Sequence, residues 1–208
     1  MAATSPVVIC NQALSWLAAT RIIELGEDTP EGRLCNENYD PLREAVLEEH
    51  EWSFAIRRTV IGAPLDDDED TRDAYDGMNR FLLADEEGVV RVLQVSGNSQ
   101  FNDADNTEWY MEQNHIITPL ERIYVRYIFS LIDTTKFSSA FVQALAARIA
   151  LDLALPITES TERATAMFQL YTQKLQIAQN LDGSQGRTRR IRSTWMKHSR
   201  SRAAGVTT

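Results

Sequence analysis

The chain lacks most of the residues that metal sites and disulfides need. Its 208 residues include two cysteines, Cys10 and Cys35, and three histidines, and none of these stands at ligand spacing from another. His50 and Glu51 begin like the zinc-protease motif HExxH, but Phe54 stands where the second histidine is required. Both cysteines fall on predicted helical apolar faces, as reduced core residues do. We therefore expect no metal and no other cofactor.

Segments that direct a chain to a membrane or build a familiar active site are also missing. No apolar run approaches the ~20 residues of a membrane span, and the opening M-A-A-T-S-P has no part of a secretion signal. Gly-rich phosphate loops and G-x-S-x-G elbows are absent. The acidic run Asp66–Asp70 lacks the alternating ligands of a calcium loop, so we interpret it as a solvated charge run. These absences predict a protein made in the cytoplasm, with no membrane partner and no enzymatic activity.

What the chain does have is an uneven distribution of charge. Residues 1–182 contain 30 acidic and 14 basic side chains, a net charge of −16, whereas residues 183–208 carry seven basic side chains and no acid. Such asymmetry is typical of a terminal segment that binds a partner of its own. Composition leaves two partners open: nucleic acid, with Trp195 stacked on a base, or an acidic protein surface, with Trp195 as the apolar anchor. The acidic body argues against a conventional DNA reader.

Start signals and apolar periodicity predict four helices. Ser5 and Thr29 are N-caps followed by proline, and Pro41 either kinks the second helix or interrupts it. Pro156 ends the third helix, and Gly183 ends the fourth. The predicted helices cover about 6–17, 30–50, 134–156 and 160–183, and the inward stripe of the last is Ala164, Phe168, Tyr171, Leu175 and Ala178.

The middle third has a different period. Short β-rich pieces alternate with turn-forming stretches, which predicts a small β insertion between the helices. The expected division is 1–60 for the first two helices, 61–130 for the β insertion, 131–183 for the last two helices and 184–208 for an extended arm. The predicted strands are Arg80–Leu83, Val89–Val95, Trp109–Met111, His115–Thr118 and Ile123–Ile128.

Residues 36–55 combine an amphipathic stripe with polar residues that a plain surface helix does not need. Asn36, Asp40 and Arg43 stand beside the face that carries Tyr39, and the aromatic pair Trp52 and Phe54 closes the run. Two interpretations stay open at this point. The polar residues either form a network at the seam between elements or are ordinary surface charges.

The same stretch resembles a known family. N-x-x-Y-D-x-x-R-x-x-V-L-x-x-x-x-W-x-F-A at 36–55, preceded by L-G-E-D-T-P-E at 25–31, is similar to the head-to-tail adaptors of tailed bacteriophages, the tail tubular protein A type. The likeness continues in Y-V-R-Y-I at 124–128, in D-L-A-x-P-I-T-x-S at 152–160 and in A-Q-N-L-D-G before the basic segment. It covers most of the chain and is weakest from Ile61 to Asn114.

The resemblance implies a mainly α (α+β) fold, a four-helix bundle with an inserted small β domain and an extended basic C-terminal tail. It implies a structural virion protein of the phage neck, a self-assembled ring of twelve subunits that links the portal protein to the tail nozzle or another tail component. Genomic duplex DNA would pass through the ring without sequence-specific binding. The alternative is a DNA-binding packaging accessory protein. The resemblance implies a portal-docking role for Arg187, Arg189, Arg190, Arg192, Trp195, Lys197 and Arg200.

Overall fold

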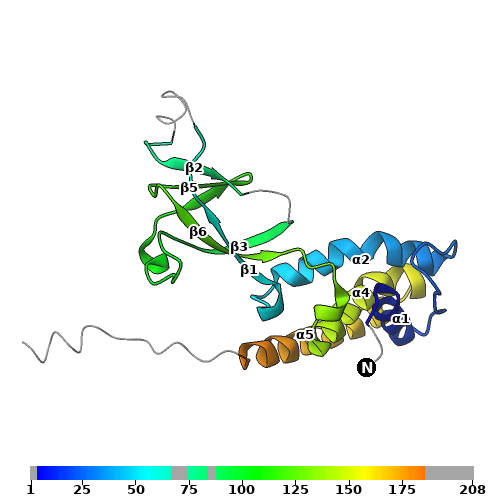
Figure 1. Ribbon diagram of the computed structural model, residues 1–208. Helices are drawn as coiled ribbons and strands as arrows, with labels where there is room; N and C mark the ends of the chain where they lie inside the picture. The colour runs from blue at the N-terminus through cyan, green and yellow to red at the C-terminus, as the bar shows by residue number, and fades with distance from the viewer. Residues whose placement is uncertain (1–3, 67–74, 84–87, 186–208) are drawn as a thin grey trace, which may run out of the picture.

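The computed structural model describes residues 4–66, 75–83 and 88–185, with helices gathered at one end and strands at the other (Figure 1). Four α-helices and six strands occur among these residues. The helices are α1 (Pro6–Trp16), α2 (Pro30–Glu48), α4 (Ser139–Thr158) and α5 (Thr161–Gly183). Short 3-10 helices occur in the connections, namely η1 (Ser53–Ala55), η3 (Ala104–Asn106) and η4 (Thr134–Lys136). The strands are β1 (Ile56–Ile61), β2 (Asn79–Leu82), β3 (Val89–Ser96), β4 (Tyr110–Glu112), β5 (His115–Thr118) and β6 (Ile123–Phe129).

Local capping explains where the helices begin. The side chains of Ser5, Thr29, Ser138 and Ser160 each accept a hydrogen bond from a backbone N–H in the first turn of the following helix. The predicted α1, α2 and α5 are confirmed to within two residues at each end. The third helix begins later than predicted, because η4 forms a separate turn before the Ser138 cap.

Neither internal proline interrupts its helix, which excludes one of the two alternatives for Pro41. Pro41 lies inside α2, which runs on to Glu48, and Pro156 lies inside α4, which runs on to Thr158. The prediction that Pro156 ends the helix is wrong. Each proline removes one backbone hydrogen bond, which a long helix survives near its exposed surface. The stop is Glu159, whose left-handed φ of 51° turns the chain while its N–H reaches the carbonyl of Leu155.

The strands form two antiparallel three-stranded sheets. The first has the order β1-β6-β3 and the second β2-β5-β4. Strand β3 is irregular, with register shifts between Val89 and Arg91 and between Val92 and Gln94. The five predicted strands are all present with small differences in their ends.

Strand β1 was missed, because residues 1–60 were assigned to helices. Its sequence I-R-R-T-V-I places two arginines together and so lacks the alternation of a half-buried strand. Tertiary contact makes up for the missing pattern: β1 pairs with β6 along its whole length, and the Arg57 guanidinium lies 3.6 Å from the centre of the Phe129 ring.

The expected fold class, a mainly α four-helix bundle, is wrong. In a bundle four helices surround a shared core, but here α4 itself occupies the centre and packs against α1, α2 and α5. Helix α5 packs mainly on α4, on the side away from α2 (Figure 1). The core continues from α4 into the first sheet, since Leu145, Val125 and Val95 belong to one buried cluster. The molecule is a mixed α+β fold.

Burial accounts for the composition of α4. By length and hydropathy Ser139–Thr158 could cross a membrane, contrary to the expectation that no apolar run is long enough. Much of this helix is buried under its three neighbours, as the core helix of a folded protein would be. Cys10 and Cys35 are free thiols buried in the same core, and the hydrogen bond with Cys35 together with burial raises the pKa of Cys10.

One position of the predicted α5 stripe is wrong. Tyr171 and Ala178 are buried, and Ala164 and Leu175 are half-buried against the core. Phe168, however, is 58% exposed, and the neighbouring Met167 takes the inward place. A strict 4-3 spacing therefore describes this helix poorly. Such spacing is needed where two helices coil around each other over many turns, and α5 packs on α4 without a coiled-coil seam.

Candidate functional site

Arg43 joins α2 to the first sheet. Its side chain is only 3% exposed, although the outer face of its helix is exposed to solvent. Nη2 donates to Ser130 Oγ at 3.0 Å, and Ser130 Oγ donates in turn to Glu44 Oε1 at 2.7 Å. Ser130 follows β6, and its N–H donates to the carbonyl of Gly88 just before β3. The guanidinium therefore fixes the end of two strands to the helix.

The hydrogen bonding of this joint is incomplete. Asp40 Oδ1 lies 3.1 Å from Arg43 Nη1, yet Nη1, Nε and the Tyr39 hydroxyl are buried without a hydrogen-bond partner among the described residues. The Asp40 contact is thus a charge pair without good hydrogen-bond alignment. Burial raises the pKa of Tyr39 to about 12, so its hydroxyl is neutral at physiological pH.

The two interpretations of the 36–55 stretch each hold for some of its residues. Arg43 is part of a buried joint, as the network interpretation predicts. Asn36 is exposed, and Asp40 has 72% of its side chain exposed, as ordinary surface residues do. Asn38, which the prediction passed over, donates to the carbonyl of Leu34 in its own helix.

Trp52 and Phe54 anchor the chain where α2 gives way to β1. Trp52 is fully buried, and its Nε1 donates to the carbonyl of Val46 at 2.8 Å. Phe141 of α4 meets Trp52 edge-on at a centroid distance of 5.0 Å and Phe54 at 5.1 Å. These contacts place the aromatic end of the motif inside the helical core, where it sets the angle between α2 and the sheet.

A second joint, which is absent from the sequence predictions, ties the C-terminal end of α5 to the turn between α2 and β1. Asp182 is 6% exposed and accepts hydrogen bonds from Ser53 Oγ at 2.7 Å and Ser53 N at 3.0 Å. His50 Nε2 lies 3.5 Å from the same carboxylate. The partners are 129 residues apart, so no local pattern could reveal them. Higher up α5, the Tyr171 hydroxyl donates to Glu49 at 2.6 Å, and burial together with this bond raises the pKa of Tyr171.

A hollow of about 540 Å³ opens beside the Asp182 joint. Arg126 stands in it paired with Glu51 at 3.1 Å, and Arg91 lies beside it on β3. Gly183, from which the chain continues to the basic segment, is at its rim. Its lining mixes both signs of charge: Glu49, His50, Glu51, Ser53, Ile56, Arg91, Arg126, Asp182 and Gly183.

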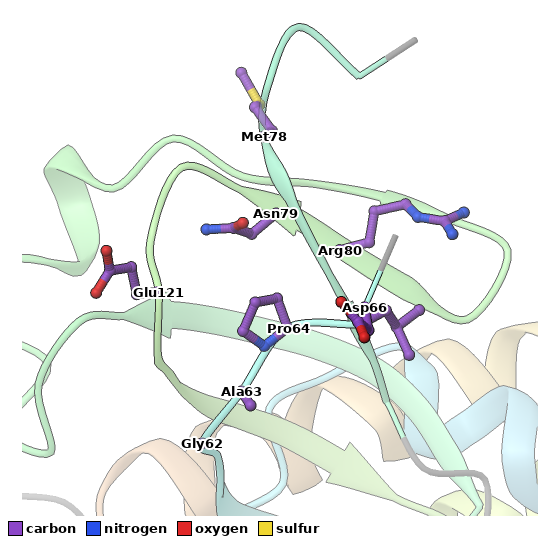
Figure 2. A pocket seen from close by; sticks show the side chains of 9 residues that line it. Gly62, Ala63, Pro64, Asp66, Met78, Asn79, Arg80 and Glu121 are labelled. Carbon is purple, nitrogen blue, oxygen red and sulfur yellow. The ribbon is translucent and has the colours of Figure 1, made fainter. Parts of the chain in front are cut away.

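A hollow of about 590 Å³ lies at the far sheet (Figure 2). Asp66, Arg80 and Glu121 are its charged residues, and in Figure 2 Glu121 stands across the opening from Arg80. Arg80 also lies 5.1 Å from the centre of the Tyr75 ring. No nucleophile with an adjacent base occurs in its lining. Over the described ranges, no three His, Cys, Asp or Glu side chains cluster closely enough to hold a metal ion.

The outer face of α2 carries a line of carboxylates, which we call the acidic stripe. Its members are all exposed and recur at intervals of three or four residues, so they lie on one side of the helix. The line extends over roughly 17 Å at 1.5 Å per residue. Its three- and four-residue spacing is visible in the sequence alone. The acidic stripe consists of Glu37, Asp40, Glu44 and Glu48.

The residues expected to dock on a portal lie outside the described residues, at 187–200. What the structure does describe is the place where that segment starts, at the Asp182 joint. No protein-family model matches the chain, and no curated protein matches it in sequence. The functional argument therefore rests on the joints, on the acidic stripe and on the motif residues themselves.

Proposed function

We propose that this protein is a structural component of a tailed bacteriophage, a ring-forming adaptor that links the portal to the tail nozzle and continues the DNA channel. The observation that carries the proposal is the segregation of charge. A net charge of −16 over residues 1–182 includes the exposed acidic stripe, and all seven basic residues after 182 are gathered in one segment. A surface of this kind repels duplex DNA, which can then slide past it without binding.

The motif residues fit a part under mechanical load. Arg43 fixes α2 to the strand ends, and Trp52 packs on α4, so the helical end and the sheets meet at a rigid angle. An adaptor between two large assemblies needs such stiffness, because movement of its helices relative to its sheets would change the position of the tail. No covalent chemistry is required of it, and we propose that it has no enzymatic activity.

Attachment to the portal falls to the basic segment after Gly183. Its seven positive charges suit an acidic protein surface, and Trp195 supplies the apolar contact that a charge-only tether lacks. The Asp182 joint holds the end of α5 in place, so the segment leaves the body from a fixed point. In the proposed assembly the subunits form a ring of twelve beneath the portal.

Co-sedimentation with portal particles tests this role. A chain ending at Gly183 should keep its helical circular dichroism and yet fail to join the particles. Reversal of charge at Arg189, Arg190 and Arg192 should weaken attachment in a salt-dependent way, whereas Trp195→Ala should weaken it with little salt dependence. Normal occupancy by the truncated chain would show that docking lies elsewhere.

The basic segment also supports the second candidate, a packaging accessory protein that grips DNA. A segment with seven positive charges and a tryptophan can contact phosphates and stack on a base. Retention of the full chain on duplex DNA at moderate salt, lost with the truncation at Gly183, would favour this function. We favour the adaptor because the acidic body opposes DNA binding along the rest of the chain.

A further inference from the structure

The outward side of α5 is unusual in a chain so rich in charge. From Thr165 to Leu181 the ionisable side chains are Tyr171, which is buried, and Lys174, which is half-buried and donates to Gln143 of α4. Every exposed position in this span is therefore uncharged. We call these exposed positions the neutral face.

Large apolar side chains stand out from the neutral face. Phe168 is 58% exposed, Leu181 52% and Ile177 46%, and glutamines such as Gln173 and Gln176 lie between them. Apolar side chains surrounded by neutral amides, with charge depleted, are the composition of the buried centre of a protein interface. A face meant for water would carry the lysines and glutamates that cover solvated helices.

We propose that a second copy of this chain packs on the neutral face of α5. The reason lies in the charge of the body. Two copies that each carry −16 over residues 1–182 repel one another, and contact through the acidic stripe would bring carboxylates together. The neutral face lets two such bodies meet without opposing like charges. A basic partner would gain more from the carboxylates elsewhere than from this face.

The position of α5 suits a contact between neighbours. Helices α5 and α2 lie on different sides of α4 (Figure 1), and the neutral face and the acidic stripe are the solvent-exposed sides of these two helices. A subunit can thus turn its carboxylates toward a channel and its neutral side toward a neighbour. This arrangement deepens the proposed ring and takes its biological setting from that proposal.

The size of the neutral face predicts a weak contact for a single pair. Seventeen helical residues extend about 26 Å, and a helix side about 10 Å wide then offers roughly 260 Å². Stable pairs bury about 800 Å² on each partner. Two copies should therefore associate reversibly, and a closed ring would gain from the two contacts that each subunit makes.

Sedimentation velocity on the full chain without portal tests this contact, with Phe168→Glu and Phe168→Lys as variants. Ile23→Glu and Ile23→Lys are matched controls, because Ile23 is 87% exposed and lies outside α5. We expect concentration-dependent association of the wild type, weakened about 10- to 100-fold by Phe168→Glu. Phe168→Lys should weaken it less, because the neighbouring copy carries a net charge of −16 over residues 1–182 and attracts a positive charge. Both Ile23 variants should stay within about 3-fold of the wild type.

Two results would overturn the inference. One is a wild-type chain that stays monomeric up to about 1 mM, and the other is an equal effect of the Phe168 and Ile23 substitutions. Failure here is distinct from failure of the proposed function. If the chain joins portal particles but does not associate through α5, the adaptor function stands and only the proposed α5 contact is wrong.

Discussion

Arg43 carries its charge with almost no exposure, while its acidic partners Asp40 and Glu44 remain largely in water. Removing the arginine therefore leaves no buried carboxylate, and the loss comes from the Ser130 hydrogen bond and from the packed stem. We predict that Arg43→Ala lowers the free energy of unfolding by about 2–4 kcal/mol in urea titrations. Arg43→Met should lose less than half as much, because it keeps the stem.

The matched control is Arg33→Ala. Arg33, on the surface of the same helix, pairs with Asp28 just before the helix begins, and 63% and 93% of the two side chains are exposed. Such pairs contribute about 0–1 kcal/mol. Equal stability losses for Arg43→Ala and Arg33→Ala would mean that the α2 joint is an ordinary surface pair.

For Tyr39 we predict that the substitution does not lower the free energy of unfolding. Its hydroxyl is buried without a partner, so Tyr39→Phe removes a desolvation cost and should leave stability unchanged within ~0.5 kcal/mol or raise it. The folded pKa of about 12 exceeds the ordinary value of 10.0. The contribution of this raised pKa to the free energy of unfolding is therefore fully present below pH 10 and is lost as pH rises from 10 toward 12. Urea titrations at pH 9 and pH 11 should show a smaller alkaline loss for Tyr39→Phe than for wild type.

At the scale of elements, the end of α5 depends on one carboxylate. Asp182→Ala leaves the Ser53 N–H without its acceptor, which should cost about 1–3 kcal/mol and fray the last turns of α5. Amide hydrogen exchange should quicken there while α4 keeps its protection. Asn180→Ala, two residues earlier in α5 and exposed, is the control and should change neither. Unchanged amide exchange in Asp182→Ala would show that the Asp182 hydrogen bonds do not stabilise the end of α5.

The sequence predicted those elements whose signals are local. The Ser5 and Thr29 caps with their prolines located α1 and α2, the Ser160 start located α5, and apolar runs located five strands. Strand β1 was missed because Arg57 is held by stacking on Phe129, a contact that no pattern in β1 contains. Phe168 was placed in the core because spacing cannot tell which of two neighbouring apolar residues turns inward. The Arg43 joint escaped prediction in part and the Asp182 joint entirely, since Ser130 and Ser53 meet partners 87 and 129 residues away.

At the scale of the whole molecule, three features divide the surface between tasks. The acidic stripe faces away from α4 on one side, the neutral face lies on α5, and the basic segment begins at Gly183. This division explains why an acidic chain would carry all its excess positive charge at one end. It also explains why the helices do not form a closed bundle: α4 is the shared core that leaves α2 and α5 free to present different faces.

Electron microscopy of the purified full chain mixed with the portal protein of the same phage tests the central claim most directly. The account predicts an added ring beneath the portal, with twelve-fold density around a continuous channel and no such density for the chain ending at Gly183. Portal particles without an added ring, at protein concentrations well above those used for imaging controls, would contradict the adaptor role.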